Sequence, residues 1–403
     1  MPERVHLISL KIARNIPTIA VLCAITFLLN ISFVMVYGLM TLYMKTVVGL
    51  SAASIGLIAG GAEAASYAIK LFSGVLSDYT KKRKAVVLVG VVCVFISRPL
   101  LALFPTLFGV MVGRFLERIG NGIQATPMEA WASDVSGTLK QQAVNFSLKR
   151  SLGFLGSFLG AWLVSYFMSN ESWDYQKVFL CASFPVLGAV LLLAFFTKEP
   201  HKNTPTKRQT FKMMLQESRF LPKEYYYLLG LTAVISFIRS LEVFIPLLAI
   251  DAFQLQANQM GYVYMLLFAS NSMFSMTTAS IFKKFGKINT LKIGITCLAL
   301  SCTLFFSSIS GVLFWLGILF WGAYQGILQT VFLILISRLV KETLRASAFG
   351  LYYLVCAIFL ALGSVLLGCI AQKTSYSFLF CFCGVLSLGV MLFLKKKGEA
   401  YSI

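Results

Sequence analysis

Apolar runs of roughly 20 residues recur along the whole chain and constrain its fold more than any other feature. An α-helix of that length crosses the hydrocarbon core of a bilayer. Only 12% of the residues are charged, about half the share that is usual in a soluble domain. The sequence therefore predicts an all-α membrane protein with twelve transmembrane helices, at residues 17–44, 51–76, 85–104, 107–133, 143–168, 177–197, 225–250, 258–282, 290–308, 311–337, 346–370 and 377–394.

The positions of the basic residues predict which ends of these spans face the cytoplasm. The formal net charge of +20 could indicate nucleic-acid binding, but 27 of the 35 basic residues lie in terminal segments and alternate links that share one side. The opposite side has only Lys45, Lys177 and Lys373. Because cytoplasmic links are rich in Lys and Arg, we expect both termini in the cytoplasm and no nucleic-acid partner. The short links suit a bacterial inner membrane.

The longest polar stretch, residues 198–224, divides the predicted spans six and six. It contains Pro200 and Pro205 and has no sustained apolar period. We interpret it as a cytoplasmic linker between an N-terminal bundle, residues 1–197, and a C-terminal bundle, residues 225–403.

An internal repeat relates these two halves. A shift of about 204 residues places Gly122 on Gly326 and Ser32 on Ser236, each within a short stretch of matching sequence. Each match alone is weak, and the common offset is the signal. The repeat predicts two six-helix bundles with pseudo-two-fold symmetry and a substrate site between them near the membrane midplane.

Two short motifs carry a family resemblance. In the link after the second span, Asp78 follows Gly74 by four residues and a basic cluster with Arg83 comes next. This resembles the signature loop of the major facilitator superfamily, although Lys81 stands where that family usually has a second Gly. The fourth span, from Arg114 to Asp134, is similar to a bacterial permease subgroup of the same superfamily, several of whose basic residues are replaced here.

The resemblance implies the fold of that superfamily and transport by alternating access, without a cofactor or a metal. It also implies a gating latch, formed by Gly74, Asp78, Arg83, Glu129 and Asp134. Asp78 would face the start of the eleventh span, and Arg83 would pair with Asp134 or Glu129. The alternative is a solvated loop whose charges only set the topology.

Ionisable residues inside a span are costly and mark candidate functional sites. We predict that the substrate or protons bind at Glu63, Arg98, Arg114, Glu117, Arg118, Arg239 and Glu242. Among these residues, Arg114 with Glu117 and Arg239 with Glu242 have i,i+3 spacing. Each of these two pairs could therefore also be a structural ion pair within its own helix.

With Lys70 included, five basic residues stand against three acidic ones among these candidates inside the spans. A central cavity lined by them would be positive, and guanidinium groups bind carboxylates and phosphates, which favours an anionic or zwitterionic substrate. The alternative is that Arg98 and Lys70 snorkel to opposite interfaces.

Glu63 has small flanking residues that leave room for water or ligand, which makes it a candidate proton carrier. It could instead pair with an Arg of another helix.

Polar residues on the spans that line the cavity in this superfamily could complete the pocket: Tyr37, Gln124, Gln325 and Gln329. The alternative for each is a hydrogen bond between helices.

The leading functional hypothesis is proton-coupled secondary transport of a small anionic organic solute, such as a carboxylate or siderophore-like metabolite, by a monomer. The chain has no ATP-binding loop motif and no motif of an intramembrane enzyme. A proton antiporter that exports drugs or metabolites is the alternative, and a channel or a non-transporting scaffold is a further one. The nine cysteines have no metal-ligand spacing.

Overall fold

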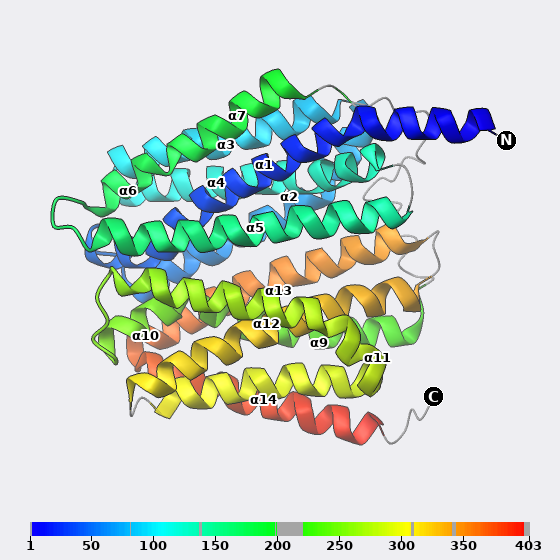
Figure 1. Cartoon of the computed structure of the whole chain (residues 1–403). Coiled ribbons are helices and arrows are strands. Elements are labelled where there is room, and N and C mark those ends of the chain that lie inside the picture. The colour runs from blue at the N-terminus through cyan, green and yellow to red at the C-terminus, as the bar shows by residue number, and fades with distance from the viewer. Residues whose placement is uncertain are drawn as a thin grey trace. The chain divides into compact units, whose positions relative to one another are not determined.

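The computed structural model of the chain describes residues 2–80, 82–136, 139–197, 199, 221–307, 310–340 and 344–398, and every regular element in these ranges is a helix (Figure 1). Helices satisfy their own backbone hydrogen bonds, which is what the interior of a bilayer requires. In the first half the elements are α1 (Pro2–Thr46), α2 (Ala52–Thr80), α3 (Arg83–Leu103), α4 (Leu107–Val135), α5 (Leu139–Met168), α6 (Tyr175–Cys181) and α7 (Ser183–Phe196). In the second half they are α9 (Lys223–Arg239), the 3-10 helix η1 (Ser240–Phe244), α10 (Ile245–Asp251), α11 (Gln259–Ser307), α12 (Gly311–Leu339), α13 (Arg345–Lys373) and α14 (Tyr376–Gly398).

Nine segments of the described chain are long and apolar enough to cross a membrane. The helix α4 is not among them, because it carries Arg114, Glu117 and Arg118 within one and a half turns. The 49-residue α11 is counted once, although Gly286 breaks it with a φ of 77°, a conformation that strains residues with a Cβ. Twelve spans result if α4, the shorter α14 and both arms of α11 are included, and this number stays a prediction.

The chain divides into two compact units. Unit 1 contains Met1–Gly38 and Ala65–Thr210, and unit 2 contains Leu39–Ala64 and Phe211–Ile403. The division after Thr210 falls inside the predicted linker, residues 198–224. The end of α1 and the start of α2 fall in unit 2, whereas the sequence places them in the N-terminal bundle, so the predicted domain limits stay a prediction.

Specific contacts join the segment Leu39–Ala64 to the rest of unit 2. At the end of α1, Lys45 Nζ lies 2.6 Å from Asp251 Oδ1 at the end of α10. Along α2, a Cβ built on Gly60 would lie 2.6 Å from Ser364 Oγ of α13. Glycine therefore lets the backbone of α2 approach α13 directly at this position.

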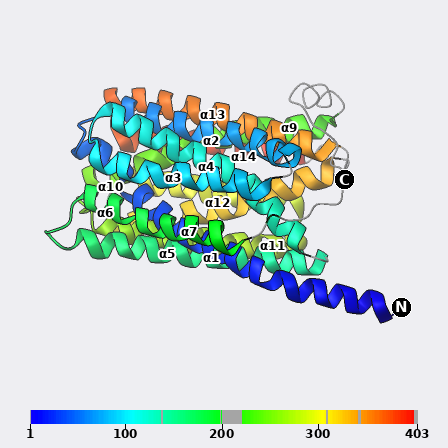
Figure 2. The ribbon, with the colours of Figure 1, turned by 90° about the horizontal axis from the view of Figure 1, so that it is seen from above.

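In unit 1, two close contacts hold α3 against α4, and the two helices lie side by side in both views (Figure 1, Figure 2). A Cβ built on Gly113 would lie 2.7 Å from Leu101 Cδ2, and one built on Gly90 would lie 2.9 Å from Gln124 Cβ. These glycines thus set the distance between the helices.

In unit 2, the same two contacts recur 204 residues further on, between the second arm of α11 and α12. Gly317 packs against Phe305 as Gly113 packs against Leu101. Gly294 packs against Leu328 as Gly90 packs against Gln124. The sequence repeat is therefore also a repeat of helix packing within each unit.

Candidate functional site

Three charged side chains of unit 1 meet in its interior. Glu117 of α4 lies between two arginines: its Oε1 is 3.1 Å from Arg98 Nη1 of α3, and its Oε2 is 2.6 Å from Arg114 Nη1, one turn earlier on α4. Arg98 Nε also donates a hydrogen bond to Ser32 Oγ of α1, at 3.0 Å. The carboxylate therefore fixes the orientation of two guanidinium groups from different helices.

A fourth charge, Arg118, lies beside aromatic rings of α1. Its guanidinium carbon is 4.9 Å from the ring centre of Phe33 and 5.3 Å from that of Tyr37. The two rings stack on each other at 5.1 Å, and Arg114 lies 5.6 Å from the Tyr37 ring. A cation over an aromatic face is attracted by the ring, so these contacts help to fix the position of the Arg118 guanidinium.

We call Arg98, Arg114, Glu117 and Arg118 the charged cluster. All four are buried, and Arg98 and Glu117 have no exposed surface. With three arginines and one glutamate its formal charge is +2. Arg98 Nη2 and Arg114 Nε are buried donors that make no hydrogen bond to any residue that the structure describes. Such groups are costly unless a ligand, water or ion accepts from them.

The repeat gives an internal comparison for the charged cluster. The residues 204 positions further on, in the matching helix pair of unit 2, are Cys302, Ile318, Trp321 and Gly322. These four are buried as well. The four equivalent positions of unit 2 therefore carry no charge, although the matching glycine contacts hold that helix pair together as well.

Unit 2 has a different polar group in its interior. Gln325 of α12 donates a hydrogen bond of 2.5 Å to Glu242 Oε2 of η1 and accepts one of 3.1 Å from Asn271 of α11. Gln325 thus links α12 to η1 and α11 through side-chain hydrogen bonds.

The other predicted site residues lie around these two groups. Arg239 is half-buried at the end of α9, three residues before Glu242, and Gln329 is half-buried one turn after Gln325. Gln124 is buried two turns after Glu117, where its amide donates to Asn121 Oδ1 at 2.9 Å. Glu63 is half-buried on α2, in the part of that helix that belongs to unit 2.

Two expectations need correction. Arg98 does not snorkel to an interface, because its side chain is inaccessible and paired with Glu117; the opposite charge on the neighbouring helix makes burial possible. The small residue Gly60, one turn before Glu63, does not open space for water or ligand, because Ser364 of α13 packs against it. Lys70 lies with its ammonium 4.6 Å from the ring centre of Tyr67.

Part of the predicted latch can be traced in unit 1. Arg83 Nη1 at the start of α3 lies 2.9 Å from Asp134 Oδ2 at the end of α4, as expected. Glu129 is exposed and interacts electrostatically with Lys149 and Arg150 of α5. The side chain of Asp78 and the surroundings of Gly74 lie outside the described residues. Because Arg83 and Asp134 both belong to unit 1, their pair joins two helices of one unit, and the latch stays a prediction.

Sequence reasoning missed Ser32 and Phe33. The signal for Phe33 was present, since it precedes Tyr37 by four residues and shares its helix face. The sequence contains no signal for Ser32, because a lone serine in an apolar span more often forms a hydrogen bond within its own helix.

Comparison with known proteins agrees with this fold and these motifs. The profile of the Major Facilitator Superfamily matches residues 22–364. An uncharacterised MFS-type transporter of Methanocaldococcus jannaschii is 27% identical over 327 residues, which are 78% of each chain. An uncharacterised protein of Mycobacterium tuberculosis is 21% identical over 79% of this chain and 78% of its own.

Solved structures share the fold. A variant of the nucleoside transporter NupG superposes with a TM-score of 0.81 at 15% identity, over 94% of this chain and 99% of its own. The human organic anion transporter MFSD10 superposes with a TM-score of 0.70 at 16% identity, over 94% and 99% of the two chains. The match of the family profile to most of the residues, together with the apolar helices, shows that this chain is an integral membrane protein that belongs to the major facilitator superfamily.

Proposed function

We propose that the protein is a secondary active transporter of a small organic anion that works by alternating access and is coupled to protons. One observation carries the anionic part of this proposal. The buried charged cluster of unit 1 has a formal charge of +2, and the matching positions of unit 2 are uncharged.

The contrast between the units argues against a purely structural role for the charged cluster. Burying charges costs free energy that pairing only partly returns, and apolar replacements of similar volume are often as stable. Unit 2 contains such a replacement, with Trp321 at the position equivalent to Glu117. A charged cluster that the packing does not require is best explained by a ligand.

The geometry of the cluster suits a carboxylate or phosphate. Glu117 orients Arg98 and Arg114 and leaves them with buried N–H groups that have no acceptor among the described residues. Arg118 adds a cation whose position the rings of Phe33 and Tyr37 fix. Guanidinium groups donate planar pairs of hydrogen bonds to anions of this shape. One transporter of this fold, human MFSD10, is named for organic anions.

Proton coupling is assigned to the acidic residues outside the charged cluster. Glu117 serves as the counter-charge of two arginines, and its neutralisation would leave both without a partner. Glu242 lies outside the charged cluster and accepts a hydrogen bond from the amide of Gln325. Glu242 and Glu63 are the acidic residues among the predicted binding residues that remain once Glu117 is assigned to the charged cluster, and both are the proposed proton carriers. We further propose a monomer in a bacterial inner membrane, with both termini in the cytoplasm.

The test begins with ligand binding, because the solute has to be identified first. The purified protein is screened by thermal shift with carboxylates, phosphorylated metabolites, organic cations and neutral sugars, since a ligand that binds the folded state raises the melting temperature. We expect anions to stabilise the wild type and to lose this effect in Arg118→Gln. Arg150→Gln is the matched control, because Arg150 also lies over a ring, that of Phe154, 5.7 Å away.

Transport of the best anion is then measured in proteoliposomes with an imposed pH gradient. Accumulation should follow the gradient in the wild type and should be lost in Glu242→Gln or Glu63→Gln. The direction of accumulation separates uptake from proton-driven efflux. Stabilisation by cations alone would exclude the anionic substrate, and flux that ignores the gradient in all variants would exclude proton coupling in favour of a channel or uniporter.

A further inference from the structure

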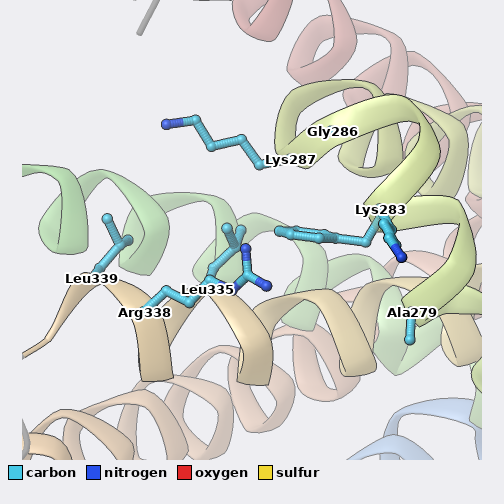
Figure 3. A pocket seen from close by; sticks show the side chains of 8 residues that line it. Ala279, Lys283, Gly286, Lys287, Leu335, Arg338 and Leu339 are labelled. Carbon is cyan, nitrogen blue, oxygen red and sulfur yellow. The ribbon is translucent and has the colours of Figure 1, made fainter.

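A basic pocket of about 750 Å³ lies in unit 2 where α11 bends (Figure 3). Three cationic side chains line it, Lys283 and Lys287 of α11 and Arg338 of α12. Apolar groups that include Ala279, Phe282 and Leu335 form the rest of its wall. It is separate from the charged cluster, which belongs to unit 1.

The break at Gly286 brings the two lysines to this pocket. With a φ of 77° the chain leaves the helical path at Gly286, and Figure 3 shows Lys283 and Lys287 on the two sides of the bend. A Cβ built on Gly286 would have no atom within 4 Å. The glycine is thus required by the backbone conformation and the space beside it is open.

The cations of the pocket are available to a ligand. Arg338 lies with its guanidinium carbon 4.9 Å from the ring centre of Phe282, and a stacked guanidinium keeps its N–H edge for an anion. None of the ion pairs formed within the described ranges involves Lys283, Lys287 or Arg338. Three like charges around one cavity attract an anion.

An exposed apolar stripe continues from the pocket along α11. Met276 lies three residues before Ala279, and Met273 another three before that, so each is the neighbour of the next on the helix surface. The side chains of Met276 and Met273 are 63% and 62% exposed. A ligand that fills the pocket and covers this stripe needs an anionic head and an apolar tail.

We propose that this pocket binds the phosphate of an anionic phospholipid, with one acyl chain lying along Met276 and Met273. Basic pockets between helices at the membrane surface are suited to such headgroups. Arg338 would donate to two phosphate oxygens and the lysines would add charge. This lipid site is additional to the proposed transport function and does not depend on it.

The test is native mass spectrometry of the full chain in detergent, titrated with phosphatidylglycerol and with phosphatidylcholine as the zwitterionic control. We expect the wild type to retain phosphatidylglycerol preferentially. Lys287→Gln and Arg338→Gln should each weaken its binding about fivefold. Lys284→Gln is the matched control: Lys284 is the neighbour of Lys283, does not line the pocket, and lies over the ring of Phe285. It should bind like the wild type.

Equal weakening by Lys284→Gln and Lys287→Gln would overturn the proposal, as would equal retention of the two lipids. A parallel thermal-shift titration with inorganic phosphate separates the two sources of a phosphate group. Stabilisation by inorganic phosphate without preference for phosphatidylglycerol overturns the lipid assignment. Arg338→Lys keeps the charge but loses the paired donors, so its affinity for phosphatidylglycerol should lie between those of the wild type and Arg338→Gln. This variant gives a readout even where Arg338→Gln does not yield monodisperse protein.

Discussion

Arg98 of α3 and Glu117 of α4 form an ion pair, with 3.1 Å between Nη1 and Oε1, and neither side chain has any exposed surface. The contact joins two helices of unit 1 through charges that water does not reach. Removing one partner of such a pair leaves an uncompensated buried charge, which costs far more than the loss of a surface ion pair.

We therefore predict that Glu117→Gln lowers the stability of the protein by about 3–5 kcal/mol. Glu117 also compensates Arg114, at 2.6 Å, so two guanidinium groups lose their counter-charge. The measurement is the shift of the denaturation midpoint in detergent. Glu129→Gln is the control, because Glu129 is exposed and should change the stability by less than about 0.5 kcal/mol.

A double-mutant cycle distinguishes pairing from a general loss of packing. Because Arg98 and Glu117 interact directly, the double variant with both changed to Gln should be less destabilised than the sum of the single variants. Additive losses would contradict the pairing described above.

The second prediction concerns Arg118→Lys, which keeps the charge and removes the planar guanidinium. Lys stacks less well on Phe33 and Tyr37 and cannot donate two parallel hydrogen bonds. We expect the affinity for the anion identified by the screen to fall about tenfold, while the melting temperature of the free protein falls only slightly because a cation stays beside the rings. An unchanged affinity would remove Arg118 from the binding site.

Much of this arrangement could be predicted from the sequence, because hydropathy and helical periodicity determine which residues share a helix and a face. The ion pair of Arg114 with Glu117 follows from their i,i+3 spacing. The family motif predicts Asp134 or Glu129 as the partner of Arg83, and the structure shows Asp134. The contact of Arg98 with Glu117 does not follow from the sequence, because no pattern along one helix states which residue of another helix lies opposite. Gly60 shows the same limit: small residues next to Glu63 indicate either space or close packing, and only the position of Ser364 on α13 decides between them.

The third prediction compares two glycines in helices. A Cβ on Gly120 would lie 2.6 Å from the carbonyl oxygen of Gly90, and the backbone of α3 cannot easily move away. Gly120→Ala should therefore destabilise unit 1 by about 1–3 kcal/mol. A Cβ on Gly230 of α9 would meet nothing within 4 Å, so Gly230→Ala should stabilise by about 0.5–1 kcal/mol. Denaturation midpoints of the two variants, measured side by side, check the predicted loss and the predicted gain of stability. Equal effects of the two substitutions would contradict the close approach of α3 and α4.

The last prediction concerns the pair of Arg83 and Asp134, at 2.9 Å between the ends of α3 and α4. Arg83 is 5% exposed at its side chain and Asp134 24%, so the interaction is only partly screened by water. Asp134→Asn should cost about 1–3 kcal/mol of stability, and so should Arg83→Gln, because either change removes the attraction between these two side chains.

A charge exchange shows whether this pair also governs transport. If the interaction itself is what matters, Arg83→Asp combined with Asp134→Arg should recover most of the stability and of the transport rate in proteoliposomes, while each single reversal loses both. Recovery of stability without recovery of rate would mean that the orientation of Arg83 toward its remaining neighbours is needed for the transport cycle. Loss of neither property in the single variants would show that the pair is a surface contact without a role in gating.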